Sequence, residues 1–279
     1  MSLPLSRADP TALPYDPARA PEVDSVPRGV LLRATIWGLF GLIYAPLFLG
    51  LVALFKGLGA GTWSFAGAGS IAGCVTAVLY GARAVGLAGA GVGLVVGGLL
   101  LFSGAVQVSL QTGVVAAMAI ALLVGLMPGF PGRCASHVPA KAVGGAFGGA
   151  VGGLAVSIAE PLHPHAFAPF AVLAFLVSVN GVLYVSSVPR LARLAGCLSR
   201  RTGPCNLVEL AVIVIMAGFT AGSMWVVSGP WLGGMTDLVR TTGDAIVQQA
   251  PAAIPGAIYG GALAGALLEL FRFRWVHDV

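Results

Sequence analysis

The sequence predicts an all-α fold, a polytopic transmembrane bundle of about eight spans with glycine-zipper packing. Hydrophobic residues make up 57% of the chain and charged residues only 9%, whereas a soluble domain has about 25% charged residues. The mean hydropathy is +0.93, and apolar runs of about 20 residues, the length that crosses a bilayer, recur along the chain. Glycines repeat at steps of four in several of these runs. Such a pattern weakens a soluble helix by roughly 1 kcal/mol per glycine, but in lipid it gives a flat face for close helix packing.

Residues 1–30 differ from the rest and are predicted to form an extended, proline-rich polar tail before a transmembrane domain over residues 31–275. The tail carries charges of both signs and has neither the basic start nor the apolar centre of a secretory signal. It has too few apolar residues to build a core. We therefore expect a neighbouring subunit to order it.

Hydropathy separates the remaining chain into spans at clusters of turn-forming residues, namely 57–61, 128–131, 161–164 and Pro251. A more polar stretch, 232–250, is expected to lie at the membrane interface as a short helix. The predicted spans are 31–55, 64–82, 85–106, 113–129, 140–160, 166–188, 206–229 and 251–271.

Basic residues predict the orientation of these spans. Only Lys56 and Arg240 fall on one side of the eight-span arrangement, and the other basic residues from Arg28 onward fall on the opposite side. By the positive-inside tendency, both termini face the cytoplasm or the mitochondrial matrix. Basic residues of the loop 189–201 are expected to bind anionic lipid headgroups; they are Arg190, Arg193, Arg200 and Arg201.

Glycines at steps of four are expected to mediate helix packing. In 144–153 two such rows lie side by side on the helix, which makes a broad groove without side chains. We expect this groove to receive another helix at close range, from this chain or a partner, and so to fix the loop that follows. The predicted packing residues are Gly69, Gly73, Gly89, Gly93, Gly97, Gly144, Gly148, Gly152, Gly256 and Gly260.

A few polar residues are candidates for a functional site. Asn180 is the strongly polar residue well inside a span, and we expect it to join helices or to line a permeation path. Glu160, His163 and His165 lie within one short loop, where they could form a metal or proton site. The alternative is an interfacial loop or a partner contact, because the intervening prolines hold the loop extended.

The four cysteines do not define a metal site by their spacing. Cys74 lies in a span and is expected to be a small filler. Cys134, Cys197 and Cys205 fall with His137 on the basic side, which leaves free thiols, a zinc site or a disulfide as alternatives.

Motifs of catalysis or cofactor binding are missing from the sequence. It contains no phosphate-binding loop, no HExxH pair, no nucleophile elbow and no haem-attachment motif. We therefore expect a protein that is not an enzyme, with no cofactor and no metal.

One stretch resembles a known family. Residues 63–102, WSFAGAGSIAGCVTAVLYGARAVGLAGAGVGLVVGGLLLF, place a tryptophan before a small-residue helix, an aromatic–Gly–Ala–Arg hairpin and a second glycine-stepped helix. This resembles the last two helices of the mitochondrial inner-membrane import translocase family, which includes an accessory subunit of respiratory complex I. Residues 254–275 are similar to the final helix of that family. The resemblance implies a multi-pass mitochondrial inner-membrane protein; the alternative location is a bacterial cytoplasmic membrane.

These observations favour a non-catalytic membrane subunit of a large inner-membrane assembly, most plausibly respiratory complex I, with other membrane subunits and lipids as partners. A small-solute transporter or channel is the alternative, because eight spans suffice for a transport path. A protein-translocation component is a further alternative, which the same family resemblance allows.

Overall fold

The structure, a computed structural model, describes residues 26–128, 137–162, 168–194, 207–229 and 247–273. Within these ranges the chain forms eight helices, each long and apolar enough to cross a membrane, which confirms the predicted all-α bundle. The helices are α1 (Val26–Gly57), α2 (Trp63–Gly81), α3 (Arg83–Phe102), α4 (Val106–Leu126), α5 (Val138–Ala159), α6 (Pro169–Leu194), α7 (Leu207–Ser228) and α10 (Ala250–Leu270).

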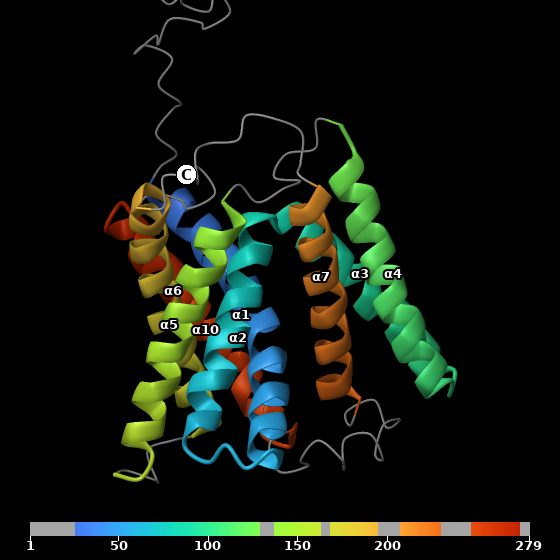
Figure 1. Cartoon of the computed structure of the whole chain (residues 1–279), viewed down its shortest axis with the longest axis horizontal. Helices are drawn as coiled ribbons and strands as arrows, with labels where there is room; N and C mark the ends of the chain where they lie inside the picture. The colour runs from blue at the N-terminus through green and yellow to red at the C-terminus, as the bar shows by residue number, and fades with distance from the viewer. Residues whose placement is uncertain (1–25, 129–136, 163–167, 195–206, 230–246, 274–279) are drawn as a thin grey trace, which may run out of the picture.

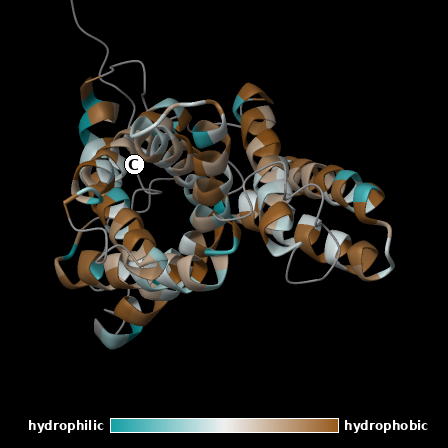
Figure 2. Cartoon of the chain, turned by 90° about the horizontal axis from the view of Figure 1, so that it is seen from below, coloured by the Kyte–Doolittle hydropathy of each residue, from teal (hydrophilic) through white to brown (hydrophobic). Residues whose placement is uncertain are grey.

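The helices form two groups (Figures 1 and 2). Helices α1, α2, α5, α6 and α10 contact one another in that order, and α10 returns to α1, so they close a five-helix ring. Helices α3, α4 and α7 pack together as a three-helix group beside it. Helix α7 contacts α1, and α2 contacts α3 and α7. The hairpin between α2 and α3 therefore connects the two groups.

The doubled glycine row of α5 lies between two other helices of the ring. A side-chain carbon at Gly149 would overlap the carbonyl oxygen of Gly69 on α2, and one at Gly145 would overlap that of Gly73. Gly148, on the adjacent row, faces the backbone of Asn180 on α6, where an added carbon would lie 2.8 Å from the carbonyl oxygen. Each row therefore allows close approach to a different helix.

Helix α10 closes the ring through two further glycine rows. Side-chain carbons at Gly256 and Gly260 would overlap backbone carbonyls of α6, and one at Gly261 would overlap the Trp37 carbonyl of α1. Because the obstructing atoms are backbone atoms, a side chain at these positions would force the helices apart. Glycine thus sets the tight seams α2/α5, α5/α6, α6/α10 and α10/α1 of the ring.

In the three-helix group the glycines mainly accommodate a side chain. Trp225 on α7 is only 1% exposed, and its indole ring occupies the space that a side chain at Gly97 on α3 or at Gly113 on α4 would need. The indole therefore fills the centre of this group.

Most helix boundaries differ from the prediction by up to four residues, and three differ by more. Helix α1 begins at Val26, so residues 26–30, expected in the tail, form its first turns. Helix α4 begins at Val106 rather than at 113, after a turn in which Gly104 adopts φ 83°; its polar first turns had lowered the apparent hydropathy. Helix α6 continues past Pro189 to Leu194, because a proline in a membrane helix removes one hydrogen bond without requiring the helix to end. The predicted interfacial helix 232–250 lies largely outside the described residues.

The basic residues of the described ranges lie mostly at one end of the bundle. The start of α1 and the end of α10 meet at this end, which we call the Arg33 end; Lys56 lies at the opposite end of α1, which we call the Lys56 end. The residues at or near the Arg33 end are Arg28, Arg33, Arg83, Lys141, Arg190, Arg193 and Arg272.

Candidate functional site

The interior of the five-helix ring carries aromatic residues of α1, with Arg33 before them along the helix and the exposed Lys56 after them. In chain order these residues are Arg33, Trp37, Tyr44, Phe48 and Lys56. Arg33, Trp37, Tyr44 and Phe48 share one face, because side chains three, four or seven residues apart lie above one another on a helix. Lys56 is exposed and lies about 140° around the helix from Arg33 at 3.6 residues per turn. At 1.5 Å per residue the segment from Arg33 to Lys56 spans roughly 35 Å, comparable with the ~30 Å hydrocarbon core of a bilayer.

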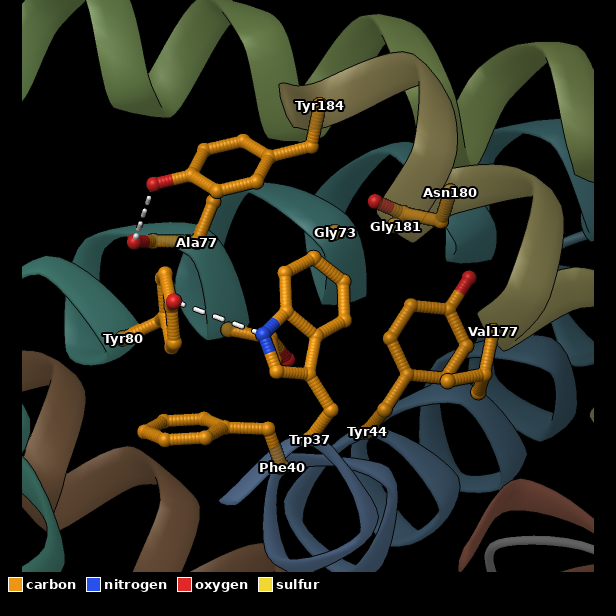
Figure 3. Close-up of a pocket in the computed structure, with 11 residues that line it drawn as sticks. Trp37, Phe40, Tyr44, Gly73, Ala77, Tyr80, Val177, Asn180, Gly181 and Tyr184 are labelled. Carbon is orange, nitrogen blue, oxygen red and sulfur yellow. Dashed lines mark hydrogen bonds between the residues drawn. The ribbon is translucent and has the colours of Figure 1, made fainter. Parts of the chain in front are cut away.

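Near the middle of the ring, α1, α2 and α6 enclose a small aromatic cavity (Figure 3). Its volume is about 40 Å³. The Tyr80 ring lies at its side, with centroid distances of 5.3 Å to Trp37, 5.2 Å to Phe40 and 6.0 Å to Tyr184, all edge-on. Such edge-to-face contacts are favourable for aromatic rings. The lining residues are Trp37, Phe40, Tyr44, Gly73, Thr76, Ala77, Tyr80, Val177, Asn180, Gly181 and Tyr184.

The cavity is lined by several polar atoms. Trp37 Nε1 donates a hydrogen bond to Tyr80 Oη over 3.3 Å, and Tyr184 Oη donates to the Ala77 carbonyl over 3.4 Å. Tyr44 Oη and Thr76 Oγ1 are buried with no hydrogen-bond partner among the described residues, although the Tyr44 hydroxyl points toward Asn180 in Figure 3. Buried polar groups normally have a partner, and a cavity of about 40 Å³ has room for about three waters. The cavity is therefore suited to water or to the polar group of a small solute.

Asn180 is placed here by glycines on two neighbouring helices. Its Nδ2 atom donates to the Gly145 carbonyl of α5 over 3.5 Å, and a side chain at Gly73 of α2 would overlap that same nitrogen. Asn180 is 7% exposed and also lines the cavity. The residue thus both joins α6 to α5 and contributes a polar group to the ring interior.

At the Lys56 end the ring opens into a second pocket of about 110 Å³, which we call the mouth pocket. Residues from α1, α2, α5 and α6 line it together with Gln249, the residue before α10. Its charged residues are Lys56 and Glu160, and the Lys56 ammonium lies 5.0 Å from the centroid of the Phe65 ring. Every ring helix thus contributes to this pocket at or beside its end.

An aromatic partition separates the mouth pocket from the cavity. Phe48 and Phe65 line the mouth pocket with ring centroids 6.1 Å apart. Phe48 also stacks on Tyr44, a lining residue of the aromatic cavity, at 6.0 Å. Passage along the ring axis would therefore require these rings to move.

Buried cations characterise the Arg33 end. Arg33 has a fully buried side chain, and its Nη1 atom donates to Glu269 Oε2 over 3.1 Å and to the Phe273 carbonyl over 2.6 Å. Lys141, near the start of α5, is also fully buried. Ionisable residues inside a membrane protein are costly, and by default they suggest a function.

The structure brings only some of the predicted site residues together. Asn180 lines the aromatic cavity and Glu160 the mouth pocket, whereas Arg190 and Arg193 are exposed on the last turns of α6. Among the described residues, no group of three or more His, Cys, Asp or Glu could hold a metal ion. The remaining candidates fall outside the described residues: His163, His165, Cys134, Cys197, Cys205, Arg200 and Arg201.

Two cysteine-related predictions concern described residues. Cys74 is a free thiol, partly exposed on α2. His137 is buried directly before α5, with a left-handed backbone at φ 55°.

The prediction missed the interior aromatic residues of α1. Their signal is present in the sequence, since Trp37, Tyr44 and Phe48 recur at helical spacing. The shared pocket of Lys56 and Glu160 carries no such signal, because one residue lies in α1 and the other directly after α5.

Comparisons with known proteins add no relative: no family model, no curated protein and no solved structure matches this chain. The fold and its site define the class, an integral multi-pass membrane protein with a helical ring and a polar interior.

Proposed function

We propose that this chain is a non-catalytic transporter or channel for a small solute, and that the five-helix ring surrounds the transport path. The observation that supports this proposal is the sequence of features along the ring: the mouth pocket, the aromatic partition, the aromatic cavity and the buried cations. Binding sites of transporters commonly lie near the bilayer midplane, and Asn180 and Tyr44 hold a corresponding position in the ring.

In this proposal a solute enters at the mouth pocket and loses part of its hydration. The partition then opens by rotation of Phe48 and Phe65, and polar groups of the cavity replace the lost water contacts. The cavity at about 40 Å³ is too small for more than a few waters. The described arrangement therefore corresponds to a closed state, and transport requires the ring helices to shift.

Uptake of a panel of labelled small solutes into proteoliposomes tests this function. We expect uptake of at least one solute above the level of protein-free vesicles. Asn180→Leu should reduce that uptake, because leucine fills the cavity without its amide. Phe175→Ala, on an exposed position of the same helix, should leave it unchanged. Uptake equal to that of protein-free vesicles for the whole panel would refute the proposal.

The second candidate is a non-catalytic subunit of a large inner-membrane assembly, such as respiratory complex I or a protein translocase. The resemblance of residues 63–102 favours it, and so does an apolar groove of about 420 Å³ between α1, α4 and α7. Gly50, Gly218 and Gly222 line this groove, and Gly50 has open space beside it. Because glycine rows within the chain receive helices, we expect a transmembrane helix of another subunit here.

Native electrophoresis of gently solubilised membranes separates the two candidates. A subunit of a large assembly would migrate in the megadalton range, in the mitochondrial inner membrane or a bacterial cytoplasmic membrane. A transporter that acts alone would migrate near its own mass of 28.1 kDa plus detergent, or as a small oligomer. In the assembly, the tail 1–30 would contact a neighbouring subunit, and deleting it would weaken incorporation.

A further inference from the structure

We propose that the mouth pocket binds a small zwitterion with an apolar body, the chemistry of a neutral amino acid such as valine. This inference rests on the proposed transport function and names its substrate class. The Lys56 ammonium would bind the carboxylate of the ligand, and the Glu160 carboxylate would bind its ammonium group.

The two charges are available for a ligand. Among the described residues, the ion pair is that of Arg33 with Glu269, so neither Lys56 nor Glu160 takes part in one. Both nevertheless line the same pocket. The Phe65 ring holds the Lys56 ammonium at the wall of the pocket through a cation–π contact at 5.0 Å. The pocket therefore presents one cation and one anion at separate positions.

The remainder of the pocket fits an apolar body. Aliphatic residues of α1, α5 and α6 form one part of its wall, including Val52, Val156 and Leu173. Gln249 adds an amide that can donate a hydrogen bond to a carboxylate or accept one from an ammonium group. The volume of about 110 Å³ suits a small branched side chain.

Charge complementarity selects a zwitterion over a simple ion. An amine without a carboxylate would neutralise Glu160 but be repelled by Lys56. A carboxylate without an amine would neutralise Lys56 but be repelled by Glu160. Lys56 is exposed and Glu160 is half-buried, so this repulsion is a Coulomb interaction that the surrounding water weakens without removing. A zwitterion satisfies both residues.

Calorimetric titration of the purified full-length protein with three probes tests the inference. Valine is compared with isobutylamine, which lacks the carboxylate, and with 3-methylbutanoate, which lacks the amine. We expect valine to bind and each analogue to bind about tenfold more weakly or worse, because each leaves one protein charge unpaired. This comparison uses the unmodified chain and does not depend on the folding of a variant. Equal binding of all three probes, or no binding of valine, would overturn the inference.

Charge-neutralising variants then test the two assignments. Lys56→Gln should weaken valine binding and reduce the preference for valine over isobutylamine. Glu160→Gln should weaken valine binding and reduce the preference for valine over 3-methylbutanoate. Arg190→Gln, exposed at the Arg33 end, serves as the control and should bind valine as the unmodified chain does. If both pocket variants bind valine more weakly but keep the same ratio of affinities for valine and the analogue, direct charge contacts are contradicted.

The outcomes also separate this inference from the transport proposal. Valine binding without uptake of any solute would support the binding site and refute transport. Uptake of another solute, with no binding of valine, would refute the zwitterion site and leave transport supported.

Discussion

The five-helix ring and the three-helix group use glycine for different purposes. In the ring, Gly149 and Gly261 bring the backbones of neighbouring helices together, and the space this leaves inside the ring is lined by polar and aromatic side chains. In the three-helix group, Gly97 and Gly113 make room for Trp225, which fills the centre. The same residue type thus leaves an axial cavity in one group and allows a packed centre in the other.

This difference shows that two helix groups of one apolar chain can have different interiors. Helices that approach through their backbones need no large side chains at the seams, so their interior faces can carry Tyr44 and Asn180. In the three-helix group Trp225 occupies the centre, and α7 contacts α1 of the ring. The substitutions below should affect the two groups differently.

The largest effect is expected for Trp225→Ala. Removing a large buried aromatic side chain costs about 3–5 kcal/mol, which should appear as a lower free energy of unfolding in mixed SDS–detergent micelles. Addition of Gly97→Leu should restore part of this loss, because leucine would occupy the vacated space. A double variant less stable than Trp225→Ala alone would show that the indole does not fill this space.

Gly149→Leu should destabilise the ring by about 1–3 kcal/mol or more through overpacking, because the added side chain meets the Gly69 backbone. The matched control is Gly91→Leu on α3, where the structure leaves open space beside the glycine. The control should be neutral or slightly stabilising, since leucine favours a helix more than glycine does. Equal thermal stability of both variants in detergent would contradict the tight α2/α5 seam.

Gly148→Leu tests the second glycine row of α5. It should lower the free energy of unfolding by an amount in the lower part of the range of about 1–3 kcal/mol. An added carbon at this position lies 2.8 Å from the Asn180 carbonyl oxygen, a milder conflict than the overlap at Gly149. Ala150→Leu, beside the two rows, should matter less. The yield of monodisperse protein after gel filtration compares the variants. If Gly148→Leu is recovered as well as Ala150→Leu, the α5/α6 seam is less tight than described.

Asn180→Ala and Ser178→Ala should have the smallest effects on stability. Each removes one hydrogen bond from α6 to a glycine carbonyl, at Gly145 and Gly260 respectively. Such bonds in membrane proteins contribute about 0.6 kcal/mol on average. Solute uptake should nevertheless separate the two, since Asn180 lines the cavity and its loss should change uptake. If solute uptake is unchanged in both variants, the role of Asn180 is helix packing alone.

The spans could be predicted because hydropathy is a local property of the chain, and Asn180 was a candidate because a strongly polar residue within a span is unusual. The end of α6 was missed because Pro189 reads as a helix end, although a membrane helix tolerates it. The partners of the glycine rows could not be assigned, because Gly149 meets Gly69 only in the folded chain. The mouth pocket could not be predicted for the same reason, since Lys56 comes from α1 and Glu160 from the position directly after α5.

The seam between α1 and α10 has a consequence for biosynthesis. It joins the first and last described helices, and its ion pair links residues 236 positions apart, Arg33 and Glu269. At 5–20 residues per second, the ribosome needs roughly 10–50 s to make the intervening chain. During that time Arg33 has been inserted without its partner, and the growing bundle is open on one side. A nascent chain stalled before α10 should therefore be more sensitive to proteases and more dependent on the insertion machinery than the finished protein.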